Sequence, residues 1–135
     1  MKQLPQTENP LVLRTDFSGQ SAWEKICAAI QKPVGGFRAY VEFIDDVAYQ
    51  DITKEHLLRL VPPDYAHSFI ILVDRTAVSL PEIPLLIIDL YDAPGREFRA
   101  IPSQIQGIEN NLSISNMDFE EFADAVDEDG VFRGF

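Results

Sequence analysis

The amino-acid sequence predicts one compact α/β (or α+β) domain in which helices pack on a mixed five-stranded sheet. Two observations favour this class. Strand and helix patterns alternate through the first half of the chain, which is typical of parallel strands joined by right-handed crossovers. In the second half, residues 68–73 and 85–91 are apolar on both faces, as central strands covered from two sides are. With 135 residues, the chain suits a single domain with the element order β-α-β-α-β-β-β-α-α.

The first elements follow a polar lead-in. Residues 1–10 contain two prolines and few apolar side chains, so we expect them to be loosely tethered to a domain over residues 11–135. Residues 11–17 predict a strand. A helix follows, because apolar side chains recur at helical spacing; they are Trp23, Ile26, Cys27 and Ile30.

The middle of the chain predicts two more strands and a short helix. Residues 37–44 alternate as a strand does, and Thr53 is placed to cap a short helix that Pro62 ends. After the apolar run at 85–91, proline and glycine predict a tight turn. This turn returns the chain antiparallel into an expected edge strand at 97–101.

The last third predicts helices and an apolar tail. Residues 103–116 are ambiguous, because spaced isoleucines favour a helix and a central glycine disfavours it. Asp118 and Glu121 have the spacing of a capping box, so we expect the final helix region to cover residues 117–129. The tail at 131–135 is apolar, and we expect it to dock on the domain's own core.

Charge and composition exclude several classes of function. The chain has 22 acidic and 11 basic residues, a net charge of −11, which repels nucleic acids and anionic membranes and favours basic proteins or divalent cations. No apolar run exceeds about six residues, far fewer than a membrane-spanning helix needs. The single cysteine, Cys27, excludes an internal disulfide and a cysteine-built zinc site. Because no signal-peptide pattern is present either, a cytoplasmic location is expected.

The C-terminal acidic residues are the first candidate site. Residues 117–129 hold seven acidic residues and no basic one, and three of them would end the predicted helix, where its dipole disfavours negative charge. We therefore predict a surface that binds a basic protein partner, formed by Asp124, Asp127, Glu128 and Asp129. Solubility, or salt bridges to a nearby arginine, is the alternative explanation; the candidates are Arg96, Arg99 and Arg133.

Aspartates at predicted strand ends are the second candidate site, a possible metal or ligand rim. They are Asp16, Asp45, Asp46 and Asp74. Parallel strands bring their carboxyl ends to one edge of the sheet, where carboxylates can hold Mg²⁺. Aspartate also follows strands simply because it caps helices and accepts loop hydrogen bonds, and no phosphate-binding loop accompanies these four.

These observations favour a non-enzymatic protein-binding module that uses an acidic surface against a basic partner. An immunity-type inhibitor that covers the cationic site of a toxin is the most concrete version. One alternative is a divalent-metal-dependent enzyme or small-ligand-binding domain, with Mg²⁺ as its cofactor. Another is a structural subunit of a larger assembly. No nucleophile, Walker or Rossmann motif is present, so no catalytic residue is predicted.

Five segments of the chain are similar to segments of a known family. They are residues 11–17 (LVLRTDF), 37–43 (FRAYVEF), 90–96 (LYDAPGR), 110–119 (from NNL to NMDF) and 129–135 (DGVFRGF). On these segments the chain resembles a family of small acidic bacterial domains of unknown function. The resemblance spans nearly the whole chain and implies one intact domain. It implies no activity, so no catalytic residue is carried over from it.

Overall fold

Two strands that are buried on both faces form the centre of the sheet. In the computed structural model, which describes residues 2–135, β3 (Phe69–Val73) and β4 (Leu85–Asp89) are buried along their whole length. They pair antiparallel, from Phe69 opposite Asp89 to Leu72 opposite Leu86. Because neither strand has a polar face, both faces of the sheet must be covered by other elements.

The sheet is mixed, as predicted, with six strands where five were expected. Its strand order is β2-β1-β3-β4-β5-β6. Strand β1 (Leu11–Arg14) runs parallel to β2 (Glu42–Ile44) on one side and to β3 on the other, which confirms the parallel strands of the first half. Strand β5 (Glu97–Ala100) returns antiparallel to β4. The sixth strand, β6 (Val131–Phe132), pairs parallel to β5, so the prediction of β5 as an edge strand is wrong.

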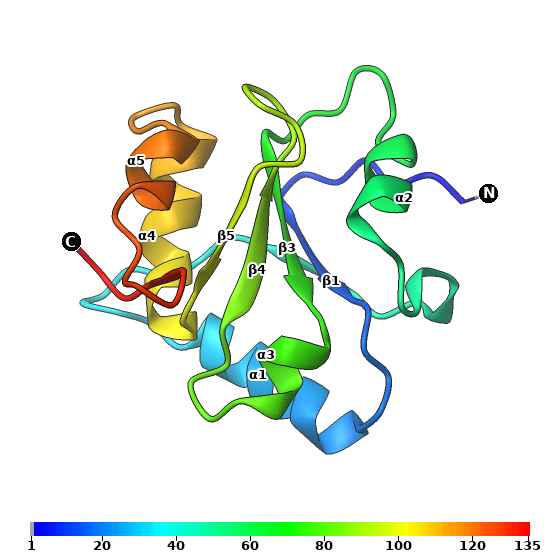
Figure 1. Cartoon of the computed structure of the whole chain (residues 1–135), viewed down its shortest axis with the longest axis horizontal. Coiled ribbons are helices and arrows are strands. Elements are labelled where there is room, and N and C mark those ends of the chain that lie inside the picture. The colour runs from blue at the N-terminus through cyan, green and yellow to red at the C-terminus, as the bar shows by residue number, and fades with distance from the viewer. Residues whose placement is uncertain (1) are drawn as a thin grey trace.

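The helices lie on both sides of this sheet (Figure 1). Helices α1 (Gln20–Gln31), α3 (Arg75–Ser79), α4 (Pro102–Ser113) and α5 (Phe119–Ala123) contribute to the core on one face. Helix α2 (Lys54–Arg59) and the short 3-10 turn η1 (Val47–Tyr49) contribute to the core on the other face. No helix in residues 2–135 is long and apolar enough to cross a membrane.

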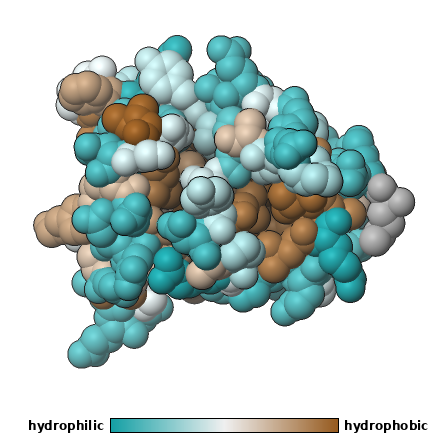
Figure 2. All heavy atoms as spheres, turned by 90° about the horizontal axis from the view of Figure 1, so that it is seen from above, coloured by the Kyte–Doolittle hydropathy of each residue, from teal (hydrophilic) through white to brown (hydrophobic). Residues whose placement is uncertain are grey.

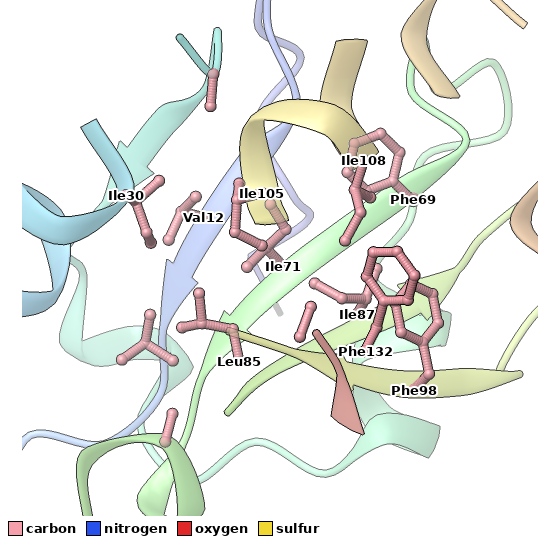
Figure 3. Close-up of a cluster of buried hydrophobic side chains, with 14 of the residues drawn as sticks. Val12, Ile30, Phe69, Ile71, Leu85, Ile87, Phe98, Ile105, Ile108 and Phe132 are labelled. Carbon is pink, nitrogen blue, oxygen red and sulfur yellow. The ribbon is translucent and has the colours of Figure 1, made fainter. Parts of the chain in front are cut away.

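Alternation along each strand sends neighbouring side chains into different cores. Ile71 packs with Ile105 and Ile108 of α4, whereas its neighbours Ile70 and Leu72 belong to the core under α2. Figure 3 shows the α4-side core, where side chains from β1, β3 and β4 converge on α1 and α4. Each face of the central strands is therefore filled by a different set of elements.

The N-terminal segment is held firmly, although it contains no helix or strand. The buried Leu4 donates its backbone N–H to the Leu60 carbonyl at 2.9 Å. The Tyr49 hydroxyl donates to the Gln3 carbonyl at 2.9 Å. For residues 2–10 the expectation of a loosely tethered lead-in is wrong, because Leu4 is a member of the α2-side core; residue 1 lies outside the described residues.

Two elements are shorter than the sequence predicts. Only residues 42–44 of the predicted strand at 37–44 pair with β1, because the Tyr40 N–H is taken by the buried Glu109 carboxylate of α4 at 2.7 Å. The final helix ends at Ala123, because the chain must turn back to pair β6 with β5. Its predicted capping box is present, with Glu121 accepting the Asp118 N–H at 2.8 Å.

The apolar tail docks on its own core, as expected. The Phe132 ring is buried at 1% exposure and meets the Phe98 and Phe122 rings edge-on, with centroids 6.4 and 5.3 Å away. Phe135 touches Phe122 and Phe132 but remains 81% exposed. The tail thus supplies one core residue and one surface residue of the same type.

We expect Phe132→Ala to lower the free energy of unfolding by about 3–5 kcal/mol, because it leaves a cavity among three aromatic rings. The matched variant Phe135→Ala removes the same group from the surface and should change it by about 0.5 kcal/mol or less. Urea denaturation of both variants checks this. Equal losses in the two variants would show that the tail is not docked through Phe132.

Candidate functional site

The four predicted rim aspartates follow parallel strands, as the sequence indicates. They therefore lie at the carboxyl ends of β1, β2 and β3, on the same side of the sheet. Each of these carboxylates already forms hydrogen bonds or a salt bridge with neighbouring groups of the chain. The Ser18 backbone N–H donates to Asp16 at 3.0 Å, and the Ser18 hydroxyl donates to the same oxygen. Arg14 pairs with Asp45 at 3.1 Å, and Lys2 pairs with Asp46.

The fourth aspartate, Asp74, has two structural roles. It caps α3 by accepting the Ala77 N–H at 3.1 Å. It also forms a bidentate salt bridge with Arg99, whose two guanidinium nitrogens donate to its two oxygens at 3.0 and 2.7 Å. Across residues 2–135, no three His, Cys, Asp or Glu side chains gather in a group that could hold a metal ion. The rim aspartates lie on the same side of the sheet, but their carboxylates do not converge on a common point where a metal ion could bind.

A buried cation, Arg14, lies among these aspartates at the carboxyl ends of the strands. The sequence did not point to it as a site residue. Arg14 ends β1, and its guanidinium donates to the Gln20 side chain at 2.9 Å, to Asp45 at 3.1 Å and to the Asp16 carbonyl at 3.2 Å. It also lies over the Phe17 ring, 4.3 Å from the centroid. Its only sequence signal is a single arginine at the end of an apolar strand. Its role is to join the loop after β1 to the loop after β2.

The predicted partner-binding residues are only partly available. Asp127, Glu128 and Asp129 lie in a turn closed by the Gly130 N–H donating to the Asp127 carbonyl at 2.9 Å. They are not at a helix C-terminus, so the helix-dipole argument for them is wrong. Arg133 pairs with both Asp127 and Asp129 at 2.7 Å, as one of the alternatives proposed, and with Glu82 at 2.7 Å. The Arg133 hydrogen bonds lower the pKa of Asp129 and of Glu82.

Five other carboxylates form a surface that we call the α5 acidic surface. They are Asp118, Glu120, Glu121, Asp124 and Glu128, of which the sequence analysis named the last two as site residues. All five are exposed, and none has a salt bridge in the part of the chain that the structure describes. Arg133, the nearest cation in sequence, is already held by three other carboxylates. The carboxylates of the α5 acidic surface are therefore not paired with any cation of the described chain.

Two large hydrophobic side chains lie exposed on the chain segments near this surface. Tyr91 is 76% exposed in the β4–β5 turn, and Ile114 is 75% exposed at the end of α4. A hollow of about 100 Å³ separates the two segments, and Tyr91, Asp92 and Asp118 are among the residues that line it. Figure 2 shows this end of the molecule, where small hydrophobic areas lie among hydrophilic side chains. Sequence patterns missed Tyr91 and Ile114, because each sits in a predicted strand or helix whose end only the structure sets.

The Asp16 carboxylate gives the rim a pH dependence. Hydrogen bonds from Ser18 hold the pKa of Asp16 below its ordinary value of 3.8, although burial acts in the opposite direction. Because the folded pKa is the lower one, the stabilisation is complete above the unfolded pKa and is lost as the pH falls through the folded pKa.

We expect Ser18→Ala to lower the free energy of unfolding by about 1–2 kcal/mol near pH 7, and the loss to shrink as the pH falls below about 4. Urea denaturation at both pH values measures this. The control Ser103→Ala removes an exposed hydroxyl that has no hydrogen bond in the described part of the chain, and it should cost little at either pH. A Ser18→Ala loss that stays constant with pH contradicts the assignment.

Comparisons with known proteins support the resemblance found in the sequence. No curated protein matches the chain. The model of the family DUF6924, described as a domain of unknown function, matches residues 9–135. The match covers all six strands of the sheet and the helices around it, and it begins just before β1. The chain therefore belongs to the DUF6924 family.

Proposed function

We propose that this chain is a protein-binding module whose α5 acidic surface engages a basic protein. The observation that carries the proposal is the set of five exposed carboxylates on and beside one short helix, none of which has a salt bridge within residues 2–135. Most other carboxylates of the C-terminal half already form salt bridges within the chain. Asp74, Glu82, Asp89, Glu97, Asp127 and Asp129 each pair with a cation of the chain itself.

The exposed apolar side chains beside the surface support contact with a protein rather than with free ions. Tyrosine is enriched among the residues that dominate binding at protein interfaces, where it fills pockets and its ring attracts cations. Tyr91 lies next to Asp92 on the wall of a hollow that also includes Asp118. A lysine or arginine of the partner would meet carboxylates and an aromatic ring together at this place.

The overall charge gives such binding a kinetic signature. A net charge of −11 steers a cationic protein towards the surface from a distance, and dissolved salt screens this attraction. Charges at the rim of an interface chiefly change the association rate. We propose a bacterial cytoplasmic setting and, as the most concrete version, an immunity-type inhibitor that covers the cationic site of a toxin.

The experiment is a tagged pull-down from the source cell's lysate at about 50 mM and about 300 mM salt, followed by binding kinetics with the purified partner. We expect the triple variant Glu120→Gln, Asp124→Asn, Glu128→Gln to lower the association rate constant about tenfold at the lower salt. The higher salt should remove most of the difference between native chain and variant.

A matched control separates this surface from net charge alone. The variant Glu8→Gln, Glu55→Gln, Asp64→Asn also removes three exposed negative charges, but on the N-terminal segment, on α2 and in the loop after it. It should leave the association rate within about twofold of the native value. Equal losses in both variants would mean that no specific surface is used, and an empty pull-down at both salts would remove the proposal.

A further inference from the structure

The outer edge of β2 offers unpaired backbone groups to another strand. The Glu42 N–H donates inward to the Pro10 carbonyl at 2.9 Å, and the Tyr40 N–H donates inward to Glu109 at 2.7 Å. The Arg38 carbonyl accepts from Asn110, the neighbour of Glu109 on α4, at 3.3 Å. Because neighbouring residues of an extended chain point their backbone groups in opposite directions, the residues between these three direct theirs outward.

These outward groups have no partner within the chain. In the part of the chain that the structure describes, the backbone groups of Ala39, Val41 and Phe43 take part in no hydrogen bond. A hollow of about 300 Å³ lies beside this segment, and Asn9 before β1 and Gln31 of α1 line it together with Arg38, Val41 and Phe43. Val41 and Phe43 are partly exposed, whereas Ala39 is only 9% exposed, so the edge is most accessible to an incoming strand at Val41 and Phe43.

At the opposite edge of the sheet, the outward backbone groups of β6 are hydrogen-bonded within the chain, in contrast to those of the β2 edge. On β6, the Val131 carbonyl accepts the Asp127 N–H at 3.0 Å, and the Val131 N–H donates to the Asp129 side chain at 3.2 Å. Proteins usually protect sheet edges with proline, inward-pointing lysine, or such local coverage. Residues 39–44 of the β2 edge contain neither proline nor lysine, so its protection is limited to the short length of β2 and the charge of Glu42.

We propose that two copies of this chain pair through this edge, antiparallel, about a twofold axis at Val41. In this register Val41 faces the partner's Val41, and Ala39 faces the partner's Phe43. Every outward N–H and carbonyl of the three residues then finds its counterpart in the other copy. The strand pairing extends the six-stranded sheet of each copy into one continuous sheet.

The side chains of the edge are self-complementary in the same register. Arg38, Tyr40 and Glu42 share one face of the extended segment, and neither Arg38 nor Glu42 has a salt bridge within the described chain. Arg38 lies diagonally across from the partner's Glu42, within reach of a long side chain, and no two like charges face each other. Pairing also covers part of Tyr40, which is 51% exposed, and of Phe37, which is 64% exposed.

The distribution of charge is compatible with a second copy at this edge. Residues 1–67, which include β2, hold 7 basic and 9 acidic residues, whereas residues 68–135 hold 4 and 13. The α5 acidic surface belongs to the other edge of the sheet, where Phe122 packs on Phe132 of β6. Two copies joined at β2 therefore keep their most acidic parts apart and leave both α5 acidic surfaces uncovered.

Light scattering coupled to size-exclusion chromatography tests the dimer on the full chain. We expect a mass of twice the 15.2 kDa of one chain. Val41→Pro removes an outward N–H without breaking an inward bond, so it should give a folded chain of monomer mass. The control Val41→Ala keeps the N–H and should remain a dimer. A native chain of monomer mass up to about 1 mM overturns the proposal, even if the edge takes a strand from another protein.

A second measurement tests the register and does not depend on the proline variant folding. Tyr40 faces the partner's Glu42 as a non-hydrogen-bonded pair, with Cα atoms about 4.5 Å apart, which a disulfide spans. An oxidised mixture of Tyr40→Cys and Glu42→Cys chains should form a disulfide-linked dimer, and each variant alone should form far less. Burial raises the pKa of Cys27 to about 11, so it reacts little. Equal cross-linking in all three samples overturns the register at Val41.

Discussion

The arrangement of this domain follows from one constraint, which is that its two central strands are apolar on both faces. β3 and β4 expose no polar face to solvent, so each side of the sheet needs its own covering layer. Helices α1, α3, α4 and α5 supply one layer. The other side has only the short α2, and the chain completes it with η1 and the N-terminal segment through Tyr49 and Leu4. A segment without regular structure thus becomes part of the core.

Because the central strands are apolar, the charged residues lie at the ends of the strands and in the loops, where arginine side chains connect neighbouring segments. Arg14 joins the loops after β1 and β2, Arg99 joins β5 to the start of α3, and Arg133 joins the tail to the turn at 127–130 and to Glu82. Arg14 is buried, and its hydrogen bonds and its contact with Phe17 offset the cost of that burial. The exposed pairs of Arg133 contribute little stability individually, but together they fix where the tail lies.

Two groups that these pairings do not satisfy lie at opposite edges of the sheet. At the β6 edge, the carboxylates of the α5 acidic surface have no salt bridge within residues 2–135, and we assign this surface to a basic protein. At the β2 edge, the outward backbone groups have no hydrogen-bond partner in the same described residues, and we assign them to a second copy of the chain. The two assignments are compatible, because the strand order places the edges on opposite sides of the β3–β4 centre. A dimer joined at β2 presents two α5 acidic surfaces, and two binding sites raise the apparent affinity for a partner that can reach both.

The sequence by itself determined the fold class, the central strands, the parallel strands of the first half, the Thr53 cap and the docking of Phe132. These follow from local signals: apolar runs, periodicity and capping residues. Tertiary structure decided the rest. The five-residue α3 is too short for a periodic signal, and β6 becomes a strand only because β5 lies beside it. The aspartates reached one edge as predicted, but their partners Arg14 and Arg99 come from other parts of the chain, as Arg133 does for Asp127 and Asp129 in the turn. Whether a carboxylate is paired or left for a ligand depends on long-range packing, which a local pattern does not contain.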